Sequence, residues 1–295
     1  MHYLTDPWHV GFSRHALIAG ILAGALCGLV GVYVVLRRMS YIGHGLSHAI
    51  FGGAVASYVA NINFYLGAGI WGFVSALLIN GVSRRRQIGA DAAIGVVTTA
   101  SFAIGVALIS HVHHLTVNPD AALFGNILGV SISGLYILLG VFVFVGAVVF
   151  FRYRQLLFIT FDPEVADAYG VNSKRYDTLF ALVMAATIVS TLQLLGVTLI
   201  AAIIVVPAIV GRLVTDSFGK LLVASMLIGA LCSVIGIYIS YYNDVASGAT
   251  IVLVAATLFF VVFVVTALTA RRRLSRLGED HGSADIGGGP SVHVG

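Results

Sequence analysis

Nine apolar segments divide most of this 295-residue chain into pieces long enough to cross a lipid bilayer. A helix needs about 20 consecutive apolar residues to span the hydrocarbon core. Inside lipid, every backbone polar group must be paired within the protein, so helices suit such segments. We predict spanning helices at 15–36, 41–60, 63–83, 90–111, 132–151, 177–195, 197–214, 220–241 and 247–270.

The composition supports a membrane protein without a separate soluble domain. Hydrophobic residues make up 59% of the chain and charged residues 9%, well outside the range of soluble domains. The predicted fold class is therefore all-α and polytopic, with eight or nine transmembrane helices. Cys27 and Cys232 lie in apolar segments and are expected to pack there rather than pair as a disulfide. We divide the chain into an extracytoplasmic segment (1–14), a transmembrane domain (15–270) and a basic, disordered cytoplasmic tail (271–295).

The basic residues predict the orientation. Threading the nine segments alternately puts 15 of the 16 Lys and Arg residues on one side, with Arg14 as the exception. The positive-inside rule assigns that side to the cytoplasm, which leaves the N-terminus outside and the C-terminus inside. These bases lie in short loops and do not form a basic face on a soluble domain. The net charge of +4 therefore does not indicate nucleic-acid binding.

Two histidines stand four residues apart in the second apolar segment. On a helix, His44 and His48 project from the same face about one turn apart. Ionisable side chains at membrane depth are expensive and usually mark a transport pathway. Gly52 and Ala56 continue the stripe, so another backbone can approach closely along it. We predict that both imidazoles bind a metal ion. The alternative is that one of them donates a hydrogen bond to a neighbouring helix.

Further candidate residues lie at the two ends of the fourth segment. His111, His113 and His114 occur at its predicted outer end, with Asp120 following. They form either a funnel that receives the metal or a solvated turn. Asp91 lies near the cytoplasmic start, where a carboxylate stabilises the positive end of a helix. The second interpretation of Asp91 is that it guides the departing cation.

The chain lacks the motifs that would make it an enzyme. A phosphate-binding loop requires GxxxxGK[ST], but the one Gly-Lys pair, Gly219–Lys220, is followed by Leu221. No HExxH zinc-protease motif is present either. Energy for transport must come from a partner subunit or an ion gradient. Proton-coupled carriers usually hold an acid in their core, and here the acids fall at helix ends or in loops. A proton-coupled secondary transporter or channel remains the alternative.

Two cytoplasmic stretches are expected to be structured. Residues 161–177 begin a short helix near Asp162–Pro163, with an acid at the cap and proline in the first turn. Residues 195–220 run through Pro207 into a short turn that holds Arg212, Asp216 and Lys220. Such loops are either docking surfaces or ordinary solvated turns.

Taken together, these segments resemble the permease subunit of the zinc, manganese and iron ABC importers, the ABC-3 family. Six pieces match in the family's order. They are 37–56 (RRMSYIGHGLSHAIFGGAVA), 89–105 (GADAAIGVVTTASFAIG), 123–129 (LFGNILG), 161–172 (FDPEVADAYGVN), 195–208 (LGVTLIAAIIVVPA) and 240–253 (SYYNDVASGATIVL).

The resemblance implies a homodimeric permease of the type II importer kind in a bacterial or archaeal plasma membrane. It would sit on a cytoplasmic dimer of ATP-binding subunits and receive a divalent metal (Mn²⁺, Zn²⁺ or Fe²⁺) from an extracytoplasmic metal-binding protein. ATP would bind the partner, and this chain would hold no permanent cofactor. The main coupling element would be 207–220 and the second 161–175. The charged residues in these elements are Asp162, Glu164, Arg212 and Asp216.

One departure from the family concerns the metal. Many members carry Asp and then His four residues later, where this chain has His44 and His48. By position, these two would be the transient intramembrane ligands. Replacing a carboxylate by imidazole keeps a ligand but removes a negative charge, which favours zinc slightly. A conduit must also release its ion, so an incomplete site is expected.

Overall fold

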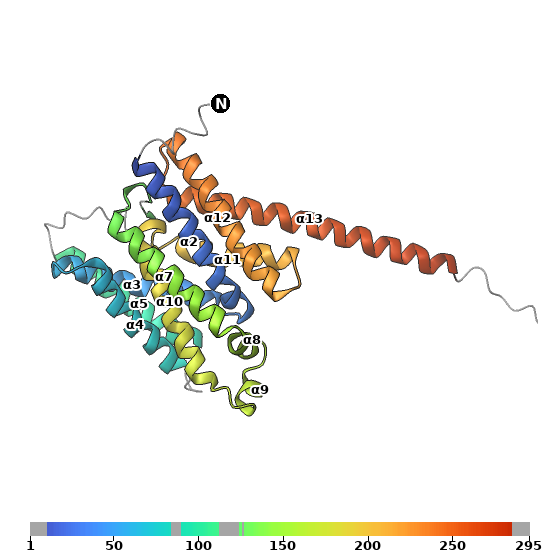
Figure 1. Ribbon diagram of the computed structural model, residues 1–295, viewed down its shortest axis with the longest axis horizontal. Coiled ribbons are helices and arrows are strands. Elements are labelled where there is room, and N and C mark those ends of the chain that lie inside the picture. Colours follow the sequence, from blue (N-terminus) through green and yellow to red (C-terminus); the bar gives the residue numbers. More distant parts are fainter. Residues whose placement is uncertain (1–10, 84–89, 112–123, 126, 285–295) are drawn as a thin grey trace, which may run out of the picture.

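A computed structural model describes residues 11–83, 90–111, 124–125 and 127–284, and its helices form a bundle from which the last one projects (Figure 1). The helices in the described residues are α2 (Gly11–Leu36), α3 (Ser40–Val59), α4 (Phe64–Ser83), α5 (Ala90–His111), η2 (Ile127–Gly129), α7 (Ile132–Phe151), α8 (Tyr153–Phe161), α9 (Pro163–Ala168), α10 (Ser173–Leu195), α11 (Ile200–Val214), α12 (Phe218–Asn243) and α13 (Ser247–Ala284).

Each of the nine predicted spanning segments is a helix. Seven helices within the described residues are long and apolar enough to cross a membrane. The other two are α11, which has 15 residues, and α3, which has 20 residues but is less apolar because of its glycines, serines and histidines. The all-α polytopic fold is therefore confirmed.

Two predicted boundaries are also confirmed. The apolar stretch 177–214 divides at Gly196, whose φ of 81° ends α10 in a conformation that favours glycine. The short helix predicted within residues 161–177 is α9. Asp162 precedes it and accepts a hydrogen bond from the backbone N–H of Val165 at 3.0 Å, which caps the helix with Pro163 in the first turn.

The structure differs from prediction at two places. Helix α8 was not expected, because its nine residues follow Arg152 where the spanning pattern ends. Helix α13 continues to Ala284, although we predicted a disordered tail from 271 onward. Once a helix is formed, each further residue adds one hydrogen bond. The Arg- and Leu-rich stretch at 271–277 consists of good helix formers, which carry the helix onward.

Small residues bring α2 and α12 close together. A Cβ added to Gly24 would collide with the backbone of Gly229, and one added to Gly28 would collide with the backbone of Ser225. The Ser225 hydroxyl donates a hydrogen bond to the carbonyl of Gly28 at 2.7 Å. Gly24 and Gly28 therefore form a packing ridge on α2, as is common between membrane helices.

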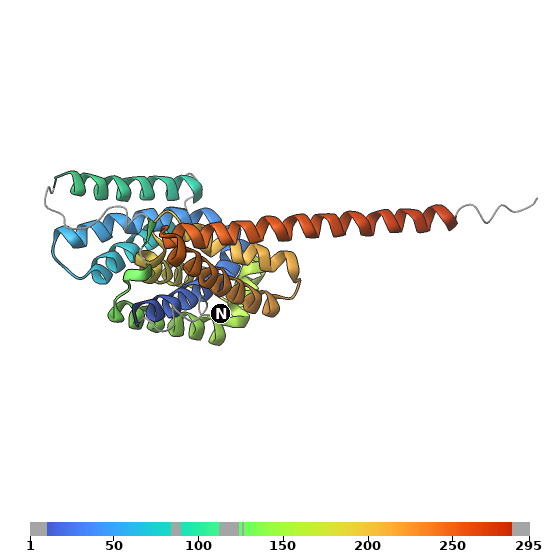
Figure 2. The ribbon, with the colours of Figure 1, turned by 90° about the horizontal axis from the view of Figure 1, so that it is seen from above.

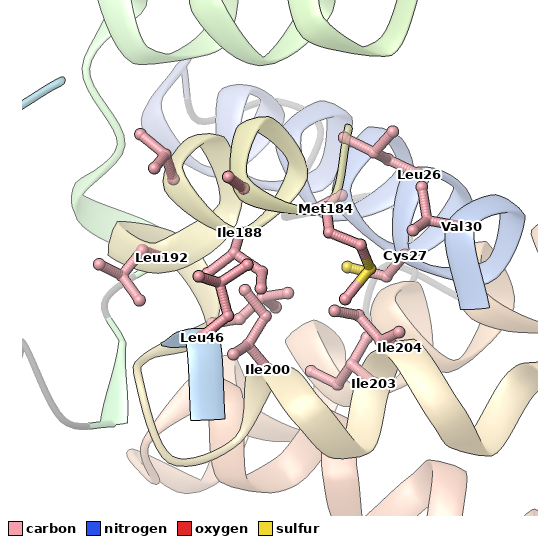
Figure 3. Close-up of a cluster of buried hydrophobic side chains, with 14 of the residues drawn as sticks. Leu26, Cys27, Val30, Leu46, Met184, Ile188, Leu192, Ile200, Ile203 and Ile204 are labelled. Carbon is pink, nitrogen blue, oxygen red and sulfur yellow. The ribbon is translucent and has the colours of Figure 1, made fainter. Parts of the chain in front are cut away.

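The core lies where α2, α3, α10 and α11 meet. Figure 3 shows Leu46 of α3 beside Ile188 of α10 and Ile200 of α11, all of them buried. Cys27 is part of this cluster and, like Cys232, is a buried free thiol. In Figure 2, α5 lies at one edge of the bundle and α7 at the opposite edge. Helix α3 is therefore an inner helix that α5 covers on one side.

Candidate functional site

The two histidines of α3 face each other as the four-residue spacing predicts. The centroids of the His44 and His48 rings are 4.6 Å apart, and the ring planes are inclined by 65°. His44 is exposed at the surface of the single chain and His48 is half-buried. This separation lets a small ion contact one nitrogen of each ring after modest side-chain rotation. The pair can therefore supply two ligands from one helix.

Aromatic rings form the immediate surroundings of the pair. The ring of His48 meets that of Phe102 from α5 edge-on at 5.3 Å. Phe102 in turn packs on Phe51 at 5.4 Å, and Tyr41 lies 6.3 Å from His44. In the part of the chain that the structure describes, neither imidazole donates a hydrogen bond to a neighbouring helix. The alternative in which a histidine serves to tie two helices together therefore gains no support.

Close backbone contact positions this face against α5. A Cβ on Gly52 would collide with the carbonyl of Ser101, and one on Gly45 would collide with the side chain of Ile94. Glycine at both positions lets α5 lie directly against α3. Phe102 reaches His48 because of this close approach. The predicted close approach at Gly52 is thus present, with α5 as the neighbour.

Within the described residues of one chain, the histidine pair does not make a complete metal site. Among the described residues, no group of three or more His, Cys, Asp or Glu side chains is placed to hold a metal ion. Transition metals in protein sites usually take four or more ligands. Further ligands would have to come from water, from a second copy of the chain, from another protein or from residues outside the described part of this chain.

Two of the remaining predicted metal-pathway residues are described, and they lie at opposite ends of α5. His111 is exposed in the last turn of α5, while His113, His114 and Asp120 lie outside the described residues. Asp91 is exposed in the first turn of the same helix, where it favours the positive helix end. Asp91 and His111 are separated by the length of α5, about 30 Å at 1.5 Å per residue.

The predicted coupling residues occupy the exposed ends of helices at one end of the bundle. Asp162 caps α9, and Glu164 lies exposed in its first turn. Arg212 is exposed in the last turn of α11, and Asp216 is exposed in the short connection to α12. These four side chains belong to two separate segments, one at the start of α9 and one around the end of α11.

A carboxylate that the sequence analysis did not single out fixes the corner between α9 and α10. Asp167 accepts a hydrogen bond from the backbone N–H of Ser173 at 2.8 Å and another from its hydroxyl at 2.7 Å. These two bonds stabilise the charged carboxylate and hold the pKa of Asp167 below its usual value of 3.8. The corner therefore has a defined shape beside the predicted coupling segment.

A buried arginine at the same end of the bundle was also missed. The guanidinium of Arg37 donates to the Asp177 carboxylate at 3.0 Å and to the Thr160 hydroxyl at 3.3 Å. It also lies over the ring of Phe180, 4.8 Å from the centroid. The Arg37 side chain is 7% exposed, and burial lowers its pKa while Asp177 raises it. The partners are more than 120 positions away in sequence, so no local pattern could reveal them.

An aromatic cluster adjoins Arg37. The ring of Phe218, at the start of α12, lies 5.6 Å from Tyr33, 5.5 Å from Tyr153 and 6.4 Å from Phe161. Tyr33 also contacts Phe180 at 6.2 Å. The cluster therefore joins the end of α2 to α8, α10 and α12, which are the elements next to both predicted coupling segments.

Comparison with known proteins identifies relatives over most of the chain. It is 38% identical over 252 residues to the manganese transport system membrane protein MntC of Halalkalibacterium halodurans, covering 85% of this chain and 86% of that protein. It is 35% identical to the manganese import system permease protein ScaB of Streptococcus parasanguinis, covering 85% and 90%. A relative from Haemophilus influenzae, 31% identical over 91% of this chain and 99% of that protein, is described as a probable iron transport system membrane protein.

Solved structures of transport proteins have a similar fold. The fold is similar to that of a chain of PsaBC from Streptococcus pneumoniae in complex with Fab, with a TM-score of 0.81 and 32% identity over 89% of this chain and 94% of that one. A metal-chelate type ABC transporter in an inward-facing conformation shares the fold at 16% identity, with a TM-score of 0.70 and 85% of each chain covered. The model of the ABC 3 transport family matches residues 9–266, and the chain belongs to this family.

Proposed function

We propose that this chain is the permease subunit of an ATP-driven importer for a divalent transition metal, with Mn²⁺ as the foremost candidate. The observation that carries this proposal is the His44–His48 pair, with ring centroids 4.6 Å apart on an inner helix of an ABC-family permease. The relatives named above are described as manganese or iron transport proteins. Imidazole binds Mn²⁺, Fe²⁺ and Zn²⁺, so the ligands are compatible with all three.

The incompleteness of the site supports transport rather than storage. Two imidazoles from one helix hold a divalent ion weakly, and weak binding permits release to the other side. His44 is exposed on the single chain, so a second copy related by a two-fold axis can bring its own pair to the same place. We propose that the permease works as a homodimer with the metal passing between the two copies.

Energy is proposed to come from a separate ATPase dimer. The chain has no phosphate-binding loop, which supports hydrolysis on a partner, and a metal-binding protein would deliver the ion from outside. The two structured segments at one end of the bundle, α9 and the connection between α11 and α12, are the proposed contacts of the ATPase. The similarity to ABC permeases does not favour the proton-coupled alternative.

The orientation is proposed from charge. Contacts of Arg37 with Asp177 and of Phe218 with Tyr153 gather the ends of α2 and α8 and the starts of α10 and α12 in one region. The helix ends and connections of this region carry Arg152, Lys174, Arg175, Arg212 and Lys220. The positive-inside rule then supports a cytoplasmic location for this end and an outside location for the N-terminus.

Metal uptake into proteoliposomes tests the proposal. The vesicles would hold this chain, its ATPase and its binding protein, and would compare wild type with the His44→Ala/His48→Ala variant. We expect ATP-dependent Mn²⁺ uptake in wild type and its loss in the double variant while the ATPase stays assembled. His15→Ala, which removes a half-buried histidine of α2, is the matched control and should transport normally. Uptake driven by a pH gradient without the ATPase, or normal transport by the double variant, would contradict the proposal.

A further inference from the structure

We infer that Arg37 is a positioning residue that transmits movement of the cytoplasmic coupling segments to α3, the helix that carries the histidine pair. The inference rests on the proposed function, because it assigns a role within an ATP-driven transport cycle. It concerns how hydrolysis on a partner subunit reaches the proposed metal site on α3.

Arg37 lies in a short, rigid connection between α2 and α3. Helix α2 ends at Leu36 and α3 begins at Ser40. Arg38 has a φ of 56°, and the backbone N–H of Met39 donates to the carbonyl of Val34 at 2.9 Å. The connection is therefore folded back on α2 with little slack. A displacement of Arg37 moves the first turn of α3 with it.

The side chain of Arg37 ties this connection to the first coupling segment. Its Nε donates to Thr160 in the last turn of α8, at 3.3 Å. Thr160 stands two residues before Asp162, which caps α9. On the other side, the guanidinium holds Asp177 near the start of α10 at 3.0 Å. One buried side chain thus joins both ends of the segment that contains α9 to the start of the histidine helix.

The second coupling segment reaches the same place through aromatic contacts. Phe218 follows the connection between α11 and α12, and its ring contacts Tyr33 at 5.6 Å and Phe161 at 6.4 Å. Tyr33 lies one helical turn before Arg37, and its backbone carbonyl accepts the N–H of Arg37 at 3.0 Å. Both coupling segments therefore meet around the last turn of α2.

The surroundings of Arg37 leave room for a second arrangement. Within the described residues, its buried Nη2 has no hydrogen-bond partner. A pocket of about 150 Å³ lies beside it, lined by Arg37, Met39, Asp177 and Phe180 together with side chains of α3 and α4. Protein interiors are normally close-packed. A charged group with an unused donor next to open space can shift to new partners, as coupling through a discrete two-state element requires.

The pocket and the histidine pair lie on different sides of α3. Ile42 and Leu46 of α3 line the pocket, and His44 is two positions from each, about 200° around the helix. Arg37 therefore does not touch the metal path and acts through the position of α3 as a rigid body. His44 is one turn from Ser40, so a shift of the first turn reaches the imidazoles directly.

The test measures coupling rather than activity alone. Proteoliposomes holding the complete complex would be assayed for Mn²⁺ imported per ATP hydrolysed. Arg37→Lys keeps the charge opposite Asp177 but replaces the planar guanidinium, whose Nε and Nη1 reach Thr160 and Asp177 separately, with a single nitrogen that cannot occupy both positions. We expect this ratio to fall about fivefold or more, within the range of allosteric coupling, while ATP hydrolysis and assembly of the complex persist. Arg38→Lys, the same change at the neighbouring exposed residue, should keep the wild-type ratio.

A second variant decides the question if Arg37→Lys does not assemble. Thr160→Val removes the acceptor of Arg37 while keeping the side-chain shape, and should lower the ratio in the same direction. If both residues act through one contact, the double variant should be no worse than Arg37→Lys alone. A wild-type ratio of Mn²⁺ imported per ATP hydrolysed in either single variant would overturn the inference. So would a Thr160→Val variant that assembles less well but whose assembled complexes keep the wild-type ratio. Absence of ATP-dependent uptake in the wild type would instead contradict the proposed function itself.

Discussion

The contact between α2 and α12 makes the effect of one methyl group calculable. Gly28→Ala adds a Cβ where the backbone carbonyl of Ser225 already lies, with the Cα of Met226 next to it. Neither atom can rotate away, because both belong to the helical backbone of α12. The two helices must separate, and the 2.7 Å hydrogen bond from the Ser225 hydroxyl to the Gly28 carbonyl must lengthen.

Three contributions set the magnitude of this change. Overpacking a tight contact costs about 1–3 kcal/mol. Loss of the Ser225 hydrogen bond costs about 1 kcal/mol more. The better helix propensity of alanine offsets about 1 kcal/mol. The net loss of about 1–3 kcal/mol corresponds to a melting temperature lower by roughly 2–12 °C, using about 2–4 °C per kcal/mol for a large domain.

Thermal unfolding of the purified permease in detergent, followed by intrinsic fluorescence, measures this shift. The matched control is Gly140→Ala in α7, where an added Cβ meets nothing within 4 Å. That variant gains helix propensity without a collision and should melt at or above the wild-type temperature. Equal melting of Gly28→Ala and Gly140→Ala would refute the conclusion that backbone contact holds α2 against α12.

Two further predictions concern the metal site and the cytoplasmic corner. His44→Asp should bind Mn²⁺ more tightly and import it more slowly, because a carboxylate adds negative charge and a hard oxygen ligand beside His48. Titration with Mn²⁺ followed by electron paramagnetic resonance would measure the affinity. An unchanged affinity would argue against His44 as a ligand. The lowered pKa of Asp167 means that its bonds to Ser173 stabilise the fold above the ordinary pKa of 3.8 and weaken as pH falls below it. Protection of the backbone amides at the start of α10 against hydrogen exchange, taken relative to the intrinsic exchange rate at each pH, should therefore fall in acid in wild type and lose this pH dependence in Asp167→Asn. The same acid response in both would contradict the assignment.

The features that could be predicted from the sequence are those that depend on residues close together in the chain. Apolar length located the spanning helices, and a glycine between two apolar runs correctly divided α10 from α11 at Gly196. The Asp162–Pro163 pair located the start of α9, because capping depends on residues within one turn. The same holds for His44 and His48, whose mutual distance follows from helix geometry alone.

Contacts between distant parts of the chain could not be predicted in this way. Arg37 is one of two adjacent arginines, and nothing local distinguishes the buried one from the exposed Arg38. Its partner Asp177 lies 140 positions away. The neighbours of the histidine pair follow from how α5 packs on α3, which the order of the helices does not determine. Extension of α13 to Ala284 was missed because a polar composition is compatible with both a helix and a disordered chain.

The modest hydropathy of α3 has a consequence for how this protein is made. A segment that carries two histidines, several serines and glycines gains little from entering lipid alone, whereas α2 and α4 on either side are apolar enough to insert. Helix α3 must then enter the bilayer together with these neighbours and be retained by contacts with α4, α5 and α10. The helix bearing the candidate ligands would thus become secure only once α10 has joined the bundle, and a chain cut short before that point would not offer a metal a route through the membrane.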